Sequence, residues 1–205
     1  MQSLITYFTK IGFSENDLKA FLSCIKTRKF SANEMILSNG QLENYLSFID
    51  TGVVRYYVIA KNKEITFDFA FKNSFYCAYD SFYSRTKTEV YIQAITDCQL
   101  YSISYENLQI LYKKCETAKK LSHIATEFLL SKKVKRELYF LTKTSQERYE
   151  VLLKEQPKYI QQIPLKYLAS YIGVVPETLS RIRKRISWPK SILESLIKLK
   201  FVLLF

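Results

Sequence analysis

The residues best suited to a binding chemistry lie in one basic stretch near the C-terminal end of the chain, between residues 163 and 185. Within it, Arg181 can form a bidentate pair with guanine O6 and N7, Glu177 can accept a hydrogen bond from cytosine N4, and Ser180 can bond to either type of base. We therefore interpret these three residues as a base-reading set. The alternative is a solvated basic helix with ordinary caps, because the helix dipole alone would account for Glu177 in a first turn.

Two short helices joined by a tight turn are predicted to position this set. Pro164 can open the first helix, Gly173 permits a left-handed turn, and Pro176 can open the second helix at its first position. The inward side is apolar or small: Leu165, Leu168, Ala169, Ile172, Leu179 and Ile182. The base-reading residues, with Thr178 and Lys184, are left facing outward, as in a helix-turn-helix that enters the DNA major groove. Phosphate or secondary DNA contacts are expected from Lys166, Thr178, Arg183, Lys184 and Arg185.

The charge of the chain is concentrated in the same region. Residues 1–116 contain 13 basic and 12 acidic side chains, whereas residues 117–205 contain 18 basic and 7 acidic ones. A nearly neutral part followed by a strongly basic part indicates two modules, of which only the second meets a polyanion.

Composition indicates a folded protein and gives little support to an enzyme. Of the 205 residues, 48% are hydrophobic and only four are Gly and four Pro, which excludes collagen-like and low-complexity classes. A single histidine and the lack of GxSxG, P-loop or paired metal-ligand motifs leave no assembled catalytic group, so no catalytic residue, metal or cofactor is predicted. The widely spaced cysteines are expected to be reduced and mostly buried, and the protein to be cytoplasmic and without stable membrane insertion.

The periodicity of apolar residues changes twice along the chain. Residues 4–25 have helical spacing, with Ser14 as an N-cap candidate for the second of two helices. Residues 30–103 have a period of two with turn signals about every ten residues, which predicts an antiparallel β-barrel. After Ser104 the helical period returns.

A long helix is predicted over residues 117–143, with a stripe at heptad spacing. The stripe contains Leu121, Ile124, Phe128, Ser131, Lys135 and Leu138, with Val134 and Leu141 beside it, and is long although two of its members are polar. We interpret it as a homodimer interface across a two-fold axis, and core packing within one chain is the alternative.

The sequence resembles the cyclic-AMP receptor and fumarate-nitrate regulator superfamily of bacterial transcription factors. The segments that carry the resemblance are Gly52-Val-Val-Arg, Ala94-Ile-Thr-Asp-Cys-Gln-Leu-Tyr-Ser-Ile-Ser-Tyr, Leu168-Ala-Ser-Tyr-Ile-Gly and Pro176-Glu-Thr-Leu-Ser-Arg. The resemblance implies an α+β fold: a cyclic-nucleotide-binding-like jelly-roll barrel (1–116), a long dimerisation helix (117–143) and a winged helix-turn-helix (144–205). Its implied partners are double-stranded DNA, a second copy of the chain, RNA polymerase and a small-molecule effector.

Departures from the family pattern limit which effector is expected. Where the cyclic-AMP receptor has an Arg-Ser pair for the phosphate, this chain has Thr88 and Glu89. The residues considered for an effector pocket are Phe69, Phe71, Arg85, Lys87, Thr88 and Glu89, although the aromatic run fits core filling better. Cys24 stands without the N-terminal cysteine cluster of the fumarate-nitrate branch, so iron–sulfur sensing is not expected.

Two interpretations of function remain at this point. The first is a dimeric, sequence-specific transcription regulator, and the second is a small-molecule-binding signalling module with vestigial DNA binding. The apolar tail after Arg185, residues 191–205, has no counterpart in the family and is expected to pack on the protein or across a dimer, with weak membrane contact as the alternative.

Overall fold

The computed structural model describes residues 1–186, with the side chain of Leu121 left undescribed. It begins with two helices, α1 (Gln2–Lys10) and α2 (Glu15–Ser23). The Ser14 hydroxyl accepts a hydrogen bond from the Asp17 backbone N–H at 3.1 Å, which confirms the predicted N-cap. The spacing of apolar residues thus predicted the two helices at the start of the chain and the strands that follow them.

Eight strands follow and form two antiparallel four-stranded sheets, with the order β1-β8-β3-β6 in one and β2-β7-β4-β5 in the other. The strands are β1 (Ile25–Phe30), β2 (Met35–Leu37), β3 (Tyr45–Thr51), β4 (Val53–Ala60), β5 (Lys63–Phe71), β6 (Phe75–Tyr76), β7 (Tyr91–Ala94) and β8 (Cys98–Ser104), with the short helix α3 (Tyr79–Ser84) between β6 and β7. This strand order is that of a jelly roll. The predicted barrel is confirmed.

Gly52 makes the tight link between β3 and β4. Its φ is +96°, and a Cβ at this position would lie 2.5 Å from the Asp97 carbonyl oxygen and 2.5 Å from Cys98 Sγ. Only glycine fits such a contact without moving the backbone of the neighbouring strand.

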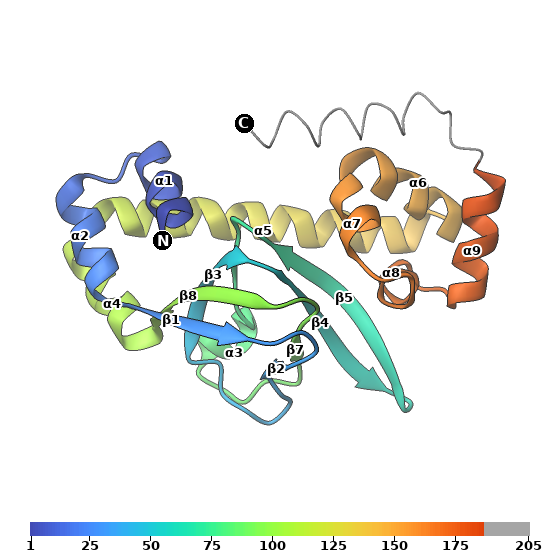
Figure 1. Cartoon of the computed structure of the whole chain (residues 1–205), viewed down its shortest axis with the longest axis horizontal. Coiled ribbons are helices and arrows are strands. Elements are labelled where there is room, and N and C mark those ends of the chain that lie inside the picture. The colour runs from blue at the N-terminus through green and yellow to red at the C-terminus, as the bar shows by residue number, and fades with distance from the viewer. Residues whose placement is uncertain (187–205) are drawn as a thin grey trace.

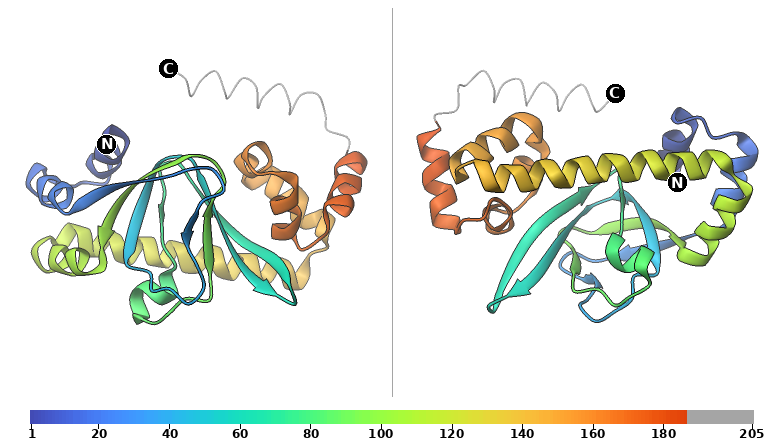
Figure 2. Two further views of the ribbon diagram at one scale, coloured as in Figure 1. Left: turned by 60° about the horizontal axis from the view of Figure 1, so that its bottom comes forward. Right: turned by 180° about the vertical axis from the view of Figure 1, so that it is seen from behind.

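The rest of the described chain is helical: α4 (Tyr105–Lys114), α5 (Glu116–Thr142), α6 (Ser145–Glu155), α7 (Pro157–Gln162), α8 (Leu165–Ile172) and α9 (Pro176–Arg185). The 27-residue helix α5 runs along the whole molecule, with α1, α2 and α4 at one end and α6 to α9 at the other (Figures 1 and 2). The long predicted helix is thus present, and it connects the two ends of the molecule.

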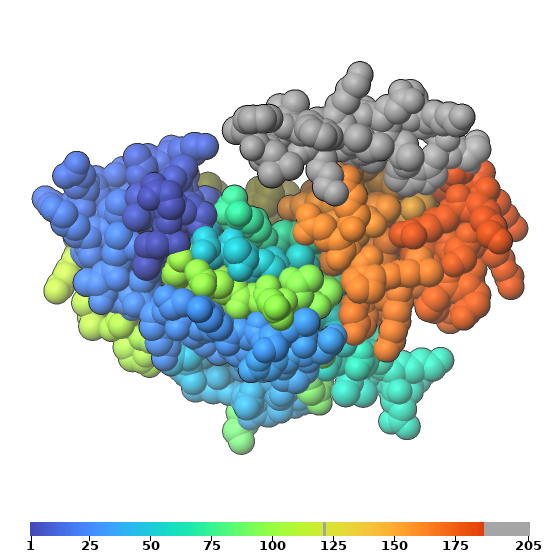
Figure 3. Space-filling model, in the orientation of Figure 1, coloured from blue at the N-terminus to red at the C-terminus, as the bar shows by residue number. Residues whose placement is uncertain are grey.

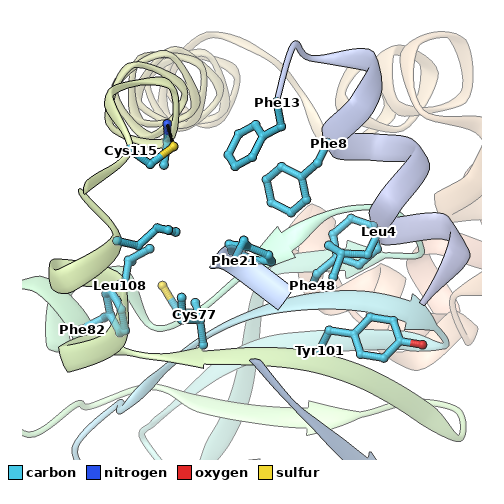
Figure 4. Close-up of a cluster of buried hydrophobic side chains, with 13 residues drawn as sticks. Leu4, Phe8, Phe13, Phe21, Phe48, Cys77, Phe82, Tyr101, Leu108 and Cys115 are labelled. Carbon is cyan, nitrogen blue, oxygen red and sulfur yellow. Dashed lines mark hydrogen bonds between the residues drawn. The ribbon is translucent and has the colours of Figure 1, made fainter. Parts of the chain in front are cut away.

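Three buried clusters hold these parts together. The first joins α1, α2 and α4 to the β1-β8-β3-β6 sheet through phenylalanines such as Phe8, Phe21 and Phe48 (Figure 4). The second fills the space between the sheets, around Ile49, Val54 and Leu100. The third contains residues of β4 and β5 together with residues of α6 to α9, so the barrel and the C-terminal helices share one core. Figure 3 shows the C-terminal helices lying against this side of the barrel.

The wing expected beside the helix-turn-helix is not found in the described residues, because residues 144–186 contain helices and no strand. The apolar tail, residues 191–205, lies outside the described residues. Three of the four cysteines, Cys77, Cys98 and Cys115, are buried as expected, and all four are free thiols.

Candidate nucleic-acid interface

Helices α8 and α9 are joined by a turn that the sequence predicts residue by residue. Pro164 is the N-cap of α8, Gly173 ends that helix in the left-handed conformation with φ +85°, and Pro176 is in the first turn of α9. The N–H groups of Gly173 and Val174 both donate to the Ala169 carbonyl at 3.0 Å, which closes the end of α8. The turn therefore fixes the angle between the two helices.

The inner faces of the two helices pack on α6. The buried residues there are Leu168, Ala169, Ile172, Leu179 and Ile182, which lie in one cluster with Tyr149 and Leu152 of α6. Leu165 is half-buried beside them. Every residue predicted to face inward is thus at least partly covered.

The outer face of α9 carries the predicted base-reading set. Glu177 and Arg181 are exposed and Ser180 is half-buried, and their spacing places them on one side of the helix. Among residues 1–186, no hydrogen bond or ion pair of these three side chains is found. Within residues 1–186, their polar groups therefore have no side-chain or backbone partner.

The residues predicted for phosphate contacts differ in their exposure. Lys166, Lys184 and Arg185 are exposed, and Thr178 is half-buried. Arg183 instead lies over the Tyr149 ring, 5.8 Å from its centroid, and its Nε is buried with no partner among the described residues. Four of the five are therefore accessible from outside, and Arg183 also contributes to packing between α9 and α6.

Two arginines hold the C-terminal end of α8, and sequence reasoning missed both. Arg136 of α5 donates from Nη2 to the Tyr171 carbonyl at 3.1 Å, and Arg148 of α6 donates from Nε to the Ile172 carbonyl at 3.0 Å. Both guanidinium groups lie on the Phe140 ring, at 4.3 and 4.4 Å from its centroid. Cations at the end of a helix where carbonyl groups lack partners are stabilising, so this pair fixes α8 and, through the turn, α9.

The barrel holds α8 from the other side through the hairpin formed by β4 and β5. The Thr66 N–H donates to Ser170 Oγ at 2.9 Å, and that hydroxyl donates to the Glu64 carbonyl at 3.2 Å. Phe69 and Phe71 of the same hairpin pack on Tyr159 of α7, with ring centroids 5.5 and 4.9 Å apart. The orientation of the helix pair is thus set by the barrel as well as by α5 and α6.

Arg55 is the central residue of this contact. Only 2% of its surface is exposed, and it bonds to Gln93 Oε1 at 2.8 Å and to Glu64 Oε2 at 2.7 Å. Its guanidinium carbon lies 3.9 Å from the ring centroid of Tyr167 on α8. A buried arginine that binds an acid, an amide and an aromatic ring holds the barrel and α8 together.

The six residues considered for an effector pocket are not brought together. Phe69 and Phe71 belong to the core shared with α7, which agrees with the core-filling interpretation. Arg85 bonds to the Glu43 carbonyl and to Asn44 Oδ1, both at 2.9 Å, and Thr88 is buried and pairs through its backbone with Gly40 and Gln41. Lys87 and Glu89 lie in the same loop after α3, and both are exposed. The backbone of Lys87 forms a β-bridge with Leu42.

Helix α5 presents an uncovered apolar surface. Ile124 is 58% exposed, Phe128 74% and Leu138 51%, and the neighbouring Leu130, Val134 and Leu141 are exposed as well. On the barrel side of α5, Lys132 and Lys133 bind the buried carboxylate of Asp68 at 2.9 and 3.0 Å. The helix is therefore fixed to its own barrel by charge while its apolar residues face outward.

No group of three or more His, Cys, Asp and Glu side chains able to hold a metal ion occurs in the described part of the chain. A helix both long enough and apolar enough to cross a membrane is likewise missing from residues 1–186.

Comparison with known proteins gives a domain and a fold. Residues 27–115 match the family model of the cyclic nucleotide-binding domain. No curated protein sequence matches the chain.

Three solved structures share its architecture. FixK2 from Bradyrhizobium japonicum has a TM-score of 0.70 and 17% identity, covering 79% of this chain and 84% of its own. The c-di-GMP responsive global regulator CLP from Xanthomonas campestris has a TM-score of 0.64 and 19% identity, covering 84% and 91%. A protein from Eubacterium rectale, described as a transcriptional regulator of the crp/fnr family, has a TM-score of 0.66 and 18% identity, covering 84% and 83%.

Residues 27–115 therefore resemble a cyclic nucleotide-binding domain, and the described chain shares its fold with these three structures. The resemblance found in the sequence is confirmed at the level of the fold.

Proposed function

We propose that this protein is a dimeric, sequence-specific DNA-binding transcription regulator. The observation that carries the proposal is the outer face of α9, where Glu177, Ser180 and Arg181 are accessible and unused by the rest of the described chain. Helices α8 and α9 then form a helix-turn-helix whose second helix enters the major groove. The α+β fold and the CRP/FNR-type neighbours support it.

The charge around α9 fits a polyanion. Lys166, Lys184 and Arg185 are exposed near the reading face, and phosphate contacts from such residues fix the register of a protein on the duplex. Thr178 supplies a further hydrogen-bond donor to phosphate. Arg183 is less available for phosphate because it also packs on Tyr149 of α6.

The dimer of this proposal forms along α5. An apolar stripe with residues as exposed as Phe128 is unusual for a monomer surface, and a second copy of the helix covers it in a two-fold pair. Ile124, Phe128 and Leu138 are the interface residues, with Leu121, whose side chain is not described, completing the heptad.

The barrel serves as an effector domain that does not bind cyclic AMP. A cyclic phosphate in an apolar site needs a guanidinium or free backbone donors, and Thr88 is buried while Glu89 adds a negative charge. RNA polymerase and a small-molecule effector are the further partners of the proposal.

Selection of bound sequences from random DNA by the purified full-length protein tests it. We expect a palindromic sequence whose half-site centres are about 34–36 Å apart, because two-fold-related helices enter successive major grooves on one face of the duplex. Binding should weaken steeply with salt. Recovery of no preferred sequence would contradict the proposal and favour a signalling module that does not read DNA.

A further inference from the structure

A cavity of about 320 Å³ lies between α5, α6, α7 and α8, outside the barrel. Aromatic and apolar side chains form its walls, among them Phe140, Val151, Leu152, Tyr159 and Tyr171. A volume in this range suits a small organic molecule with one or two rings.

The charges on the cavity wall are unbalanced. Lys132, Lys135, Arg136 and Arg148 line it against a single acid, Glu155. Lys135 pairs with that acid at 3.0 Å, and Lys132 pairs with Asp68. In the described structure the two arginines have no carboxylate partner and donate only to backbone carbonyl groups.

The two arginines retain unused donors at this place. Arg136 Nε is buried without a hydrogen-bond acceptor among the described residues, and a buried donor left unpaired is destabilising. Burial, together with the charge of Arg136, lowers the pKa of Arg148. Two guanidinium groups that contact one phenylalanine ring, without an anion among the described residues, form a site that an anion would stabilise.

We propose that this cavity binds a small aromatic anion, carrying a carboxylate or a phosphate, as an effector. The anionic group meets Arg136 and Arg148, whose planar forks suit bidentate oxygen anions, and the ring lies among Leu152, Tyr159 and Tyr171. Because the same arginines hold the carbonyl groups of Tyr171 and Ile172, the bound anion acts on the end of α8. Binding itself is independent of DNA, whereas its effect on α9 rests on the proposed function.

The experiment titrates three naphthalene probes into the full-length ¹⁵N-labelled protein and follows backbone amides by NMR. The probes are 1-naphthoate, 1-naphthyl phosphate and the neutral 1-naphthamide. We expect saturable shifts centred on Leu152, Tyr159 and Ile172 with at least one anion, and at least about tenfold weaker binding of the neutral amide. The tighter anion identifies the natural group as a carboxylate or a phosphate.

Three variants locate the site. Arg136→Gln removes the charge and should weaken anion binding about tenfold or more. Val151→Phe fills the cavity without changing any charge and should abolish binding even if the arginine variant folds poorly. Lys133→Gln, which removes a cation that does not line the cavity, should leave binding unchanged.

Equal binding of the neutral probe, undiminished binding to Val151→Phe, or no saturable shift at millimolar concentration would overturn the inference. The same preparations are then tested on the selected DNA. Intact DNA recognition without probe binding would reject this site and leave the proposed function standing, while probe binding without DNA recognition would do the reverse.

Discussion

The guanidinium of Arg55 in the barrel stacks on the ring of Tyr167 in α8, with 3.9 Å between the guanidinium carbon and the ring centroid. The same group lies 4.1 Å from the centroid of Tyr57, so it contacts one ring of its own strand and one ring of the helix. Through this contact a residue of β4 contributes to the position of the helix pair α8–α9, together with the contacts of Arg136, Arg148 and Ser170.

The first prediction concerns the strength of this contact. Arg55→Met and Tyr167→Leu should each lower the free energy of unfolding by about 1–3 kcal/mol, since each removes a buried interaction. The double variant should show a coupling of about 1–2 kcal/mol, as expected for a desolvated cation over a ring. Urea unfolding of the four proteins measures it. Pairing Arg55→Met with Lys10→Ala, at the other end of the molecule, gives the additive control.

The second prediction concerns pH. Burial raises the pKa of Asp68, but the charges of Lys132 and Lys133 outweigh it and hold the pKa below its usual value. The carboxylate therefore stabilises the fold fully above about pH 4, and this contribution is lost as the pH falls through the lower folded pKa. Asp68→Asn should be less stable than the wild type at neutral pH, with the difference shrinking in acid. Urea unfolding of the two proteins at several pH values checks this, and a difference that stays constant into acid would contradict it.

The third prediction separates base reading from phosphate binding. Arg181→Ala should weaken binding to the selected DNA by about 1–3 kcal/mol and relax the preference at one G·C pair in each half-site. Lys166→Ala should weaken binding to all sequences about equally and reduce the salt dependence by about one ion. Binding curves on the selected site and its single-base variants distinguish the two. An unchanged sequence preference in Arg181→Ala would mean that another residue reads the base.

The fourth prediction concerns assembly. Phe128→Glu or Ile124→Glu places unpaired charge in the apolar stripe of α5 and should give monomers that bind DNA poorly. Light scattering measures the mass. Thr126→Glu adds the same charge on another side of α5 and should leave the dimer intact. A dimeric mass for Phe128→Glu would assign the stripe to another role.

The fifth prediction concerns the barrel. Cyclic AMP and cyclic GMP should give no saturable heat in calorimetry at millimolar concentration. Arg85, a cation near the loop after α3, is already bonded to Glu43 and Asn44 and stacks on Tyr105 at 4.3 Å. A backbone donor of the same region, the Ala78 N–H, is already used as well, because it donates to the buried Glu43 carboxylate. Saturable heat that disappears in Arg85→Ala or Lys87→Ala would show that the barrel senses nucleotides after all.

The sequence predicted those helix ends at which the backbone preference of a single residue determines the conformation. Gly173 had to end α8 in a left-handed conformation, Pro176 could begin α9, and Ser14 caps the helix that follows it. Alternation of apolar residues likewise predicted the strands, because one face of each sheet is buried.

Contacts between distant segments could not be predicted in this way. Nothing near Arg136 or Arg148 in the sequence distinguishes them from surface arginines, and the segment Gly52-Val-Val-Arg does not show what Arg55 binds. Each of the three binds a group more than twenty residues away. The expected pocket residues Phe69 and Phe71 illustrate the same point, since their alternation shows burial but not that α7 provides the cover. The expected wing came from family resemblance and not from a local pattern. Residues 144–186 contain no strand, and the rest of the predicted domain, residues 187–205, lies outside the described residues, so the wing stays a prediction.

Because the barrel and the C-terminal helices share a core, part of the barrel remains uncovered until the ribosome has synthesised those helices. Thr66 and Ser170, which meet through a hydrogen bond, are 104 residues apart. At about 5–20 residues per second, the ribosome supplies the second partner roughly 5–20 s after the first. For that interval Phe69 and Phe71 have no helix to cover them, so the nascent chain carries an exposed aromatic surface on a strand at the edge of its sheet. We expect the hairpin to be the segment through which incomplete chains aggregate or meet a chaperone.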